Sequence, residues 1–332
     1  MRHSFHAKGT TPFHPLIGPC LACALIACVV EQPAPPPLGT GDAPGGDGDG
    51  DGDGDGDVDA GGEAPCEYHF GRTFVLDTLQ IMQVGEGFDL NGDGVPDNAL
   101  GLLGAAANPK LAERIHSGQA LYLYDFDAWS DPPTADDPHM RMTVYRGLDA
   151  DDPEDPSNNL AGQGRFLVPR EQFDVTCEPH GAFGDAVLKN RRLEAFAPRW
   201  ELVFSGIGTV EFHNFYAAVE FHDDFTQMEG WGGGVWPLCS LSRAHFAGGL
   251  GGATYLDVIA KGIEIAPDID LDNDGIERLV GTSKVEGCVD GDGTLIPGSD
   301  CPCDPRIQDG FSVAFWGKGP RATITGTSSS TE

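Results

Sequence analysis

Short segments rich in β-branched and aromatic residues recur along the chain between residues 74 and 325. Turn-forming residues bound these segments, and acidic turns such as residues 149–159 separate several of them. This rhythm predicts a mainly β fold, an antiparallel β-sandwich or barrel with two or three short helices packed on it. The predicted strands cover residues 74–84, 120–129, 140–146, 164–168, 192–204, 209–221, 310–315 and 321–325.

Two stretches interrupt the strand rhythm with helical signals. Residues 98–107 and 109–117 predict a broken pair of helices, in which Asn108 caps the second helix and Pro109 takes its first position. Residues 254–265 predict a further helix, because apolar side chains recur there at helical spacing. We expect both regions to lie against a sheet. The apolar positions of the later helix are Leu256, Ile259, Ala260 and Ile263.

The first 28 residues have the features of a lipoprotein signal peptide. Arg2 and Lys8 are the early charges, and the apolar run over residues 16–27 is too short to stay in a bilayer as a spanning helix. The run ends in Leu25-Ile26-Ala27-Cys28, which resembles a bacterial lipobox. That resemblance implies that Cys28 becomes the lipid-modified first residue after cleavage. The alternative is a secretory signal without a lipid.

Residues 29–65 predict a disordered tether. A proline-rich piece is followed by an alternating glycine and aspartate tract over residues 46–57, with almost no apolar side chains. Too little surface can be buried there to offset the entropy lost on ordering the backbone. We therefore expect one β-rich, calcium-binding domain over residues 66–325 and a disordered tail over residues 326–332.

The charge of the chain limits its partners. It has 52 acidic and 20 basic residues, a formal net charge of −32 at pH 7. Two basic residues and no acidic ones precede Cys28, so 18 basic residues face 52 acidic ones in the mature chain, a charge of about −34. This argues against nucleic acid or an anionic membrane surface as a partner. Much of the charge lies in loops rich in Asp, Gly and Pro, where solvation and ion binding explain it.

Six cysteines in the expected domain fit an exported protein. An even number in an oxidising compartment suggests up to three disulfides, in any of fifteen pairings. Cys288 paired with Cys301 or Cys303 would close an acidic loop. Zinc is the rival for Cys301-Pro302-Cys303, but no histidine follows at ligand spacing. The six candidates are Cys66, Cys177, Cys239, Cys288, Cys301 and Cys303.

Residues 89–97 predict a calcium loop. The segment Asp-Leu-Asn-Gly-Asp-Gly-Val-Pro-Asp places oxygen-bearing side chains at its positions 1, 3, 5 and 9, with Gly94 at the bend. Calcium prefers several carboxylate, amide and carbonyl oxygens, and this spacing supplies them from one short segment. The alternative is an aspartate- and asparagine-rich turn without an ion. The candidate ligands are the side chains of Asp89, Asn91, Asp93 and Asp97 and the carbonyl of Val95.

This loop resembles the calcium loops of FG-GAP and integrin-type repeats, and more loosely those of thrombospondin type 3 repeats and dockerins. It departs from the EF-hand, because position 12 is Leu100 where an EF-hand needs glutamate. The similarity covers about a dozen residues. The blades of an FG-GAP propeller would repeat the loop, and this chain does not, so a propeller is rejected.

A second acidic segment lies at residues 268–277. Aligned on Gly275 it offers three further candidate calcium ligands, but its ninth position is Arg278, a cation. Glu277 is the only nearby substitute for that ligand. The three candidates are Asp270, Asp272 and Asp274.

Two other patterns suggest chemistry or binding. Glu211 and His213, followed by Glu220 and His222, would hold a transition metal that activates water if the two segments met in a hairpin. The alternative is one long strand with a wetted face. The glycine-rich segment 230–237 would present Trp231 and Trp236 to sugars if it formed an open loop, although such aromatics more often fold onto the core. No other catalytic template is present in the sequence.

The chain resembles the uncharacterised secreted lipoproteins of myxobacterial-type genomes, over most of residues 66–325. The likeness lies in the lipobox, the Asp/Gly tether, the segment 89–101 and the Asp-Gly-Phe-Ser segment 309–312. The likeness implies location and architecture only: a lipid-anchored protein of the cell envelope, at the outer membrane or cell surface. The loop 89–97 predicts calcium as the cofactor, and the sequence leaves any protein or glycan partner unidentified. We expect a structural or binding module, with a secreted metal-dependent hydrolase as the alternative.

Overall fold

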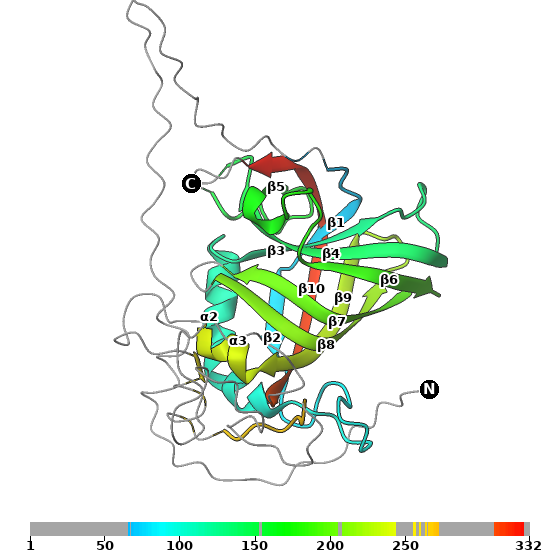
Figure 1. Ribbon diagram of the computed structural model, residues 1–332. Helices are drawn as coiled ribbons and strands as arrows, with labels where there is room; N and C mark the ends of the chain where they lie inside the picture. The colour runs from blue at the N-terminus through cyan, green and yellow to red at the C-terminus, as the bar shows by residue number, and fades with distance from the viewer. Residues whose placement is uncertain are drawn as a thin grey trace, which may run out of the picture.

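Eight antiparallel strands close into a barrel in the computed structural model of the chain (Figure 1). Each strand pairs with the next, and the last, β10, pairs back with β1. The structure describes residues 66, 68–152, 155–204, 208–243, 255–256, 259, 263, 265–271 and 309–328. The barrel strands are β1 (Arg72–Val75), β3 (Leu121–Asp127), β4 (Asp137–Asp149), β6 (Ala182–Lys189), β7 (Arg192–Phe204), β8 (Gly208–Phe221), β9 (Gln227–Pro237) and β10 (Gly310–Ser328).

Two further strands extend the sheet. β2 (Thr78–Ile81) follows β1 and pairs with β10, while β5 (Arg165–Pro169) pairs antiparallel with β4 and parallel with the end of β10. The predicted mainly β fold is therefore confirmed, and it is a barrel. β10 joins the two strands expected at 310–315 and 321–325 and continues to Ser328, past the expected domain boundary at 325.

The glycine-rich segment 230–237, expected as a loop, is strand β9. Its glycines leave room for aromatic rings on both faces of the sheet. A Cβ on Gly234 would lie 2.9 Å from the Phe215 ring inside the barrel, and a Cβ on Gly233 would lie 2.7 Å from the Phe88 ring outside it. Glycine has a low strand propensity, but it occupies these positions because a larger residue would displace the packed rings.

The barrel interior is filled by large apolar side chains. Phe74, Phe126 and Phe183 are fully buried, and the Trp200 ring lies 4.3 Å from that of Phe215 between centroids. An eight-stranded barrel is just wide enough for side chains to fill its interior. In the part of the chain that the structure describes, these inward residues form one continuous core.

A second apolar cluster lies outside the barrel wall. Outward-facing residues of β1, β3, β4 and β10 pack there with β5 and with the segment that precedes β1. A disulfide between Cys66 and Cys177, with Cα atoms 5.5 Å apart, ties that segment down. Cys239 is also disulfide-bonded. The remaining candidates, Cys288, Cys301 and Cys303, lie outside the described residues.

The first helical region differs from its prediction. Instead of a broken pair, a 3₁₀ helix η1 (Ala99–Leu103) leads directly into α2 (Gly104–His116), with Pro109 inside the helix. Asn108 does not cap a helix, because its side chain binds β2: Oδ1 accepts from the Ile81 N–H at 2.8 Å and Nδ2 donates to the Ile81 carbonyl at 2.9 Å. The hydrogen bonds of Asn108 to β2 have taken the place of the helix cap that the sequence predicted for it.

The other helices are short. They are η2 (Arg170–Gln172) and α3 (Leu238–Arg243). Of the helix expected over 254–265, only scattered residues are described, among which Leu256 and Ile259 are buried in the core, so that helix remains a prediction. Within the described ranges, no helix is both long and apolar enough to cross a membrane.

A buried carboxyl group holds the start of β1 to β3. Asp125 accepts hydrogen bonds from the Thr73 hydroxyl at 2.8 Å and from the Gly71 N–H at 3.2 Å, with only 1% of the residue exposed. Burial, with a smaller effect of the nearby Asp127 carboxylate, raises the pKa of Asp125 from 3.8 to about 6, although the hydrogen bonds from Thr73 and Gly71 lower it. The folded state therefore favours the protonated carboxyl.

Asp125→Asn should flatten the pH dependence of stability between about pH 4 and 6. Because the folded-state pKa is raised, the proton on Asp125 stabilises the fold fully below pH 3.8, and this contribution is lost as pH rises through about 6. The shift corresponds to about 3 kcal/mol. Denaturant unfolding across this pH range measures it, with the exposed Asp223→Asn as control. Equal pH profiles for Asp125→Asn and wild type would contradict the assignment.

Candidate functional site

The acidic loop 89–97 lies on the outside of the barrel over β9 and β10. Phe88 and Asp97 form an isolated β-bridge at its base, where the Asp97 N–H donates to the Phe88 carbonyl at 2.8 Å. The Phe88 ring covers Gly233 of β9 and stacks on Tyr216 of β8 at 5.8 Å. The base of the loop is therefore fixed to the barrel wall.

Asn98 fastens the other side of the base. Its Nδ2 donates to the Met82 carbonyl at 2.8 Å and to the Gln83 carbonyl at 3.0 Å, while its Oδ1 accepts from the Ala314 N–H of β10 at 3.1 Å. Asn98 is 3% exposed. One amide thus joins the chain before the loop, the chain after it and the barrel.

Inside the loop, side-chain oxygens accept hydrogen bonds from the loop's own backbone. Asp89 accepts from the N–H groups of Gly92 at 2.6 Å and Gly94 at 3.0 Å. Asp97 accepts from the Leu90 N–H at 2.7 Å and from the Asn91 N–H at 3.3 Å. These bonds wind the backbone around its acidic side chains.

The side chains of the other two candidate ligands, Asn91 and Asp93, also accept hydrogen bonds from the loop backbone, from residues only two positions away. Asn91 Oδ1 accepts from the Asp93 N–H at 3.0 Å, and Asp93 Oδ1 accepts from the Val95 N–H at 2.7 Å. A carboxylate oxygen has two lone pairs, so a single N–H partner leaves it able to bind a cation.

A carboxylate from far along the chain faces this loop. Burial raises the pKa of Asp97, and the charges of Asp268 and Asp93 raise it further. Asp268 is itself held in place, because one of its oxygens accepts from the Ser312 N–H at 2.8 Å and the other from the Ser312 hydroxyl. Ser312 in turn accepts from the Ala99 N–H at 2.7 Å, just beyond the loop.

The two acidic segments of the sequence therefore meet. Leu90 of the first loop packs against a small apolar cluster of Val235, Ile269 and Leu271, and Ile269 forms a β-bridge with Gly310. Of the second set of candidate ligands only Asp270 is described, while Asp272 and Asp274 lie outside the described residues. Asp268 was not among the predicted ligands, because nothing in its spacing connects it with residues 89–97.

The donor set of the first loop is anionic and made only of oxygen, which fits calcium better than zinc. Yet within the described ranges no three acidic, histidine or cysteine side chains gather closely enough to hold a metal ion. The assignment of Asp89, Asn91, Asp93, Val95 and Asp97 as calcium ligands therefore stays a prediction.

The alternative metal cluster is wrong. Glu211, His213 and Glu220 lie on one continuous strand, β8, with His222 just after it, and not on two neighbouring strands. Nine residues of strand separate the two histidines by about 30 Å. The buried His213 is satisfied locally by a hydrogen bond between Nε2 and the Glu211 carboxylate, and Glu211 also pairs with Arg199 at 3.2 Å.

The other two side chains of that cluster lie at the end of β8. Glu220 pairs with Arg192 across the sheet at 2.6 Å, and His222 is exposed. A register shift between residues 213 and 216 changes the alternation of β8 but does not bring the pairs together. The reactive side chains of the hydrolase alternative are therefore not assembled.

The two tryptophans of β9 do not form a joint platform for sugars. Residues 231 and 236 are an odd number of positions apart, so their side chains leave opposite faces of the strand. Trp236 faces the core, where its ring lies 5.5 Å from Phe212 and its Nε1 donates to the Ser240 hydroxyl at 3.2 Å.

Comparison with known proteins gives no family. No protein-family model, curated protein or solved structure matches the chain. The resemblance to secreted lipoproteins and to FG-GAP loops thus remains a prediction, and the lipobox at Cys28 lies outside the described residues.

Asn98→Ala should lower the free energy of unfolding by about 2 kcal/mol or more, because two carbonyls and one N–H lose their partner. Thermal or denaturant unfolding measures this in the absence of calcium. Asn91→Ala is the matched control, since its amide is exposed. If both variants lose the same stability, Asn98 is not the anchor of the loop.

Proposed function

We propose that this protein is a lipid-anchored cell-envelope protein whose β-barrel domain is stabilised by calcium and acts as a structural or binding module. The observation that carries the proposal is the acidic loop itself. Its base is fixed to the barrel through Phe88 and Asn98, and its side-chain oxygens accept hydrogen bonds from its own backbone. Burial, followed by the charges of Asp268 and Asp93, raises the pKa of Asp97, so its charged form is disfavoured there unless a cation offsets the charge.

The side chains of Asp89, Asn91, Asp93 and Asp97 and the Val95 carbonyl would hold the ion. A bound calcium ion supplies positive charge that neutralises these carboxylates and crosslinks the backbone that carries them. The chain's own residues then connect the loop to the fold, because the base is bonded to β9 and β10 and approached by Asp268. Binding to the folded state alone adds stability by mass action.

Export and anchoring have separate support. The Cys66–Cys177 disulfide suits an oxidising compartment, where such bonds persist. The lipobox at Cys28 and the tether 29–65 would hold the domain away from a membrane at the outer membrane or cell surface. A filled barrel interior and the separated Glu and His pairs of β8 favour a structural or binding role over hydrolysis.

Calcium should raise the melting temperature of the mature domain by roughly 5 °C or more at saturation, and chelator should reverse the rise. Asp93→Ala should remove most of this response, because it deletes one ligand carboxylate without touching the buried base of the loop. Differential scanning fluorimetry or calorimetry with and without calcium measures the difference.

Asp155→Ala is the matched control, since it removes one exposed acidic side chain from a different loop. It should keep the full calcium response. A rise of equal size in wild type and Asp93→Ala would show that calcium acts elsewhere on the domain.

Cys28→Ser should move the protein from the membrane fraction to the soluble fraction of expressing bacteria and abolish its labelling by a radioactive fatty acid. The reason is that serine offers no thiol for the lipid. Cys23→Ser is the control and should leave labelling intact. Undiminished labelling of Cys28→Ser would place the lipid on another residue or exclude it.

A further inference from the structure

A cavity of about 400 Å³ lies where the barrel wall divides. β10 pairs with β9 as far as Pro320 and with β5 from Thr323, so the two partner strands separate at residues 321–322. Hydrogen bonds mark the two sides of this split: the Arg321 N–H donates to the Thr226 carbonyl and the Thr323 N–H to the Gly164 carbonyl, at 2.9 and 3.0 Å.

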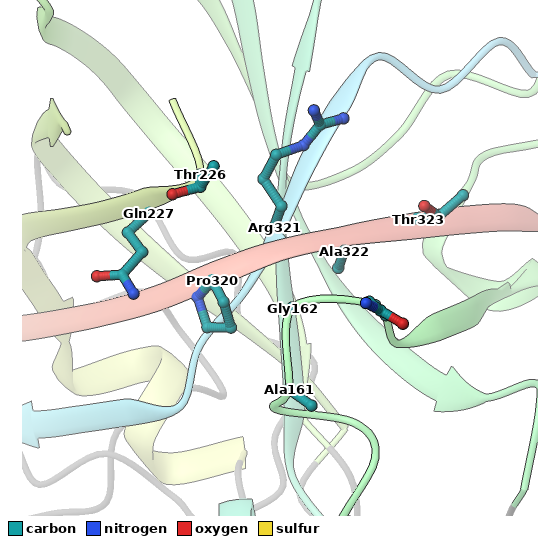
Figure 2. Close-up of a pocket in the computed structure, with 9 residues that line it drawn as sticks. Ala161, Gly162, Thr226, Gln227, Pro320, Arg321, Ala322 and Thr323 are labelled. Carbon is teal, nitrogen blue, oxygen red and sulfur yellow. The ribbon is translucent and has the colours of Figure 1, made fainter. Parts of the chain in front are cut away.

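The lining of the cavity is polar and carries one charge, that of Arg321. Figure 2 shows the lining residues around this part of β10. Thr226 lies just before β9 and Gln227 begins it, while Ala161 and Gly162 belong to the loop before β5. The other polar groups of the lining are hydroxyls, carboxamides and backbone atoms. The polar side chains are those of Gln163, Thr226, Gln227, Arg321 and Thr323.

Among the described residues, no carboxylate pairs with the positive charge of Arg321. Arg321 is exposed and forms no ion pair with any residue that the structure describes. It lies close to a second guanidinium, that of Arg72, whose pKa is lowered by burial and by the charge of Arg321. In a chain with a net charge of −32, these two guanidinium groups lie near each other, and among the described residues only the exposed Asp131 carboxylate pairs with either of them.

Arg72 is held in place by an aromatic ring. Its guanidinium lies 5.4 Å from the centre of the Trp129 ring, and only 15% of its side chain is exposed. Its nearest carboxylate, that of Asp131, is 3.8 Å away and almost fully exposed to solvent, so it neutralises little of the charge. The pair therefore presents an oriented positive field beside the cavity.

We propose that this cavity binds a small anion that also carries hydroxyl groups, such as an acidic sugar, with Arg321 holding the anionic group. A guanidinium binds carboxylate or phosphate through two parallel hydrogen bonds. Carboxamides and hydroxyls suit the hydroxyls of a sugar, and the volume lies within the range of small-molecule sites. The site is separate from the acidic loop and does not depend on calcium.

Isothermal titration of the mature protein with glucuronate, glucose 6-phosphate, glucose and inorganic phosphate tests the proposal. At least one of the two sugar anions should bind saturably and more tightly than glucose or phosphate, and the tighter sugar anion identifies the preferred acid group. Arg321→Gln should weaken that binding by roughly 10-fold or more. Arg191→Gln, which removes the same charge from an ion pair with Asp223, is the control and should bind as wild type.

Absence of saturable binding by both sugar anions would overturn the proposal. So would phosphate or glucose binding as tightly as the sugar anions, or Arg321→Gln binding as tightly as wild type. Repeating the titration with Asp93→Ala separates this site from the calcium proposal, because the variant should keep sugar-anion binding whether or not it responds to calcium.

Discussion

The pairing of β10 on both of its edges is the interaction on which the rest of the structure depends. One edge bonds to β9 and the other to β2 and β1, so a single strand converts an open meander into a closed wall. Close approach makes this possible: a Cβ on Gly319 would lie 1.7 Å from the Val75 carbonyl oxygen, where only glycine fits. Closure removes the exposed strand edges that would otherwise invite aggregation.

Closure also decides where function can lie. Aromatic side chains fill the barrel, so sites are left to the outer face and to the places where strands part. The acidic loop is fixed to the outer face by Phe88 and Asn98, and the cavity beside Arg321 lies where β10 exchanges one partner for another. The two candidate sites carry opposite charge and have no residues in common.

The fold class could be predicted because strand-forming segments have a local signal. Strands β6 and β9 could not be predicted. β6 contains glycine and aspartate, which are rare in strands, and the glycines of β9 leave room for the rings of Phe88 and Phe215 although glycine disfavours strands. Pro109 predicted a helix start for a sound local reason, yet the bonds of Asn108 to Ile81 outweighed it.

The same limit applies to the site. The spacing of oxygen-bearing residues over 89–97 can be read from the sequence. The approach of Asp268 cannot, because it depends on contacts formed only in the fold, namely its hydrogen bonds to Ser312 and the β-bridge between Ile269 and Gly310. Sequence spacing alone likewise left two interpretations of residues 211–222, a metal-binding hairpin and one long strand with a solvent-exposed face. β8 continues without a reversal from Gly208 to Phe221, so the structure shows the long strand.

The Cys66–Cys177 disulfide has a mechanical consequence. It joins Cys66, shortly before β1, to a segment 111 positions later, between β5 and β6. Any tension arriving along the preceding chain passes through this covalent link into the body of the barrel. The short strand β1, with only four residues to resist unzipping, is thereby spared the load.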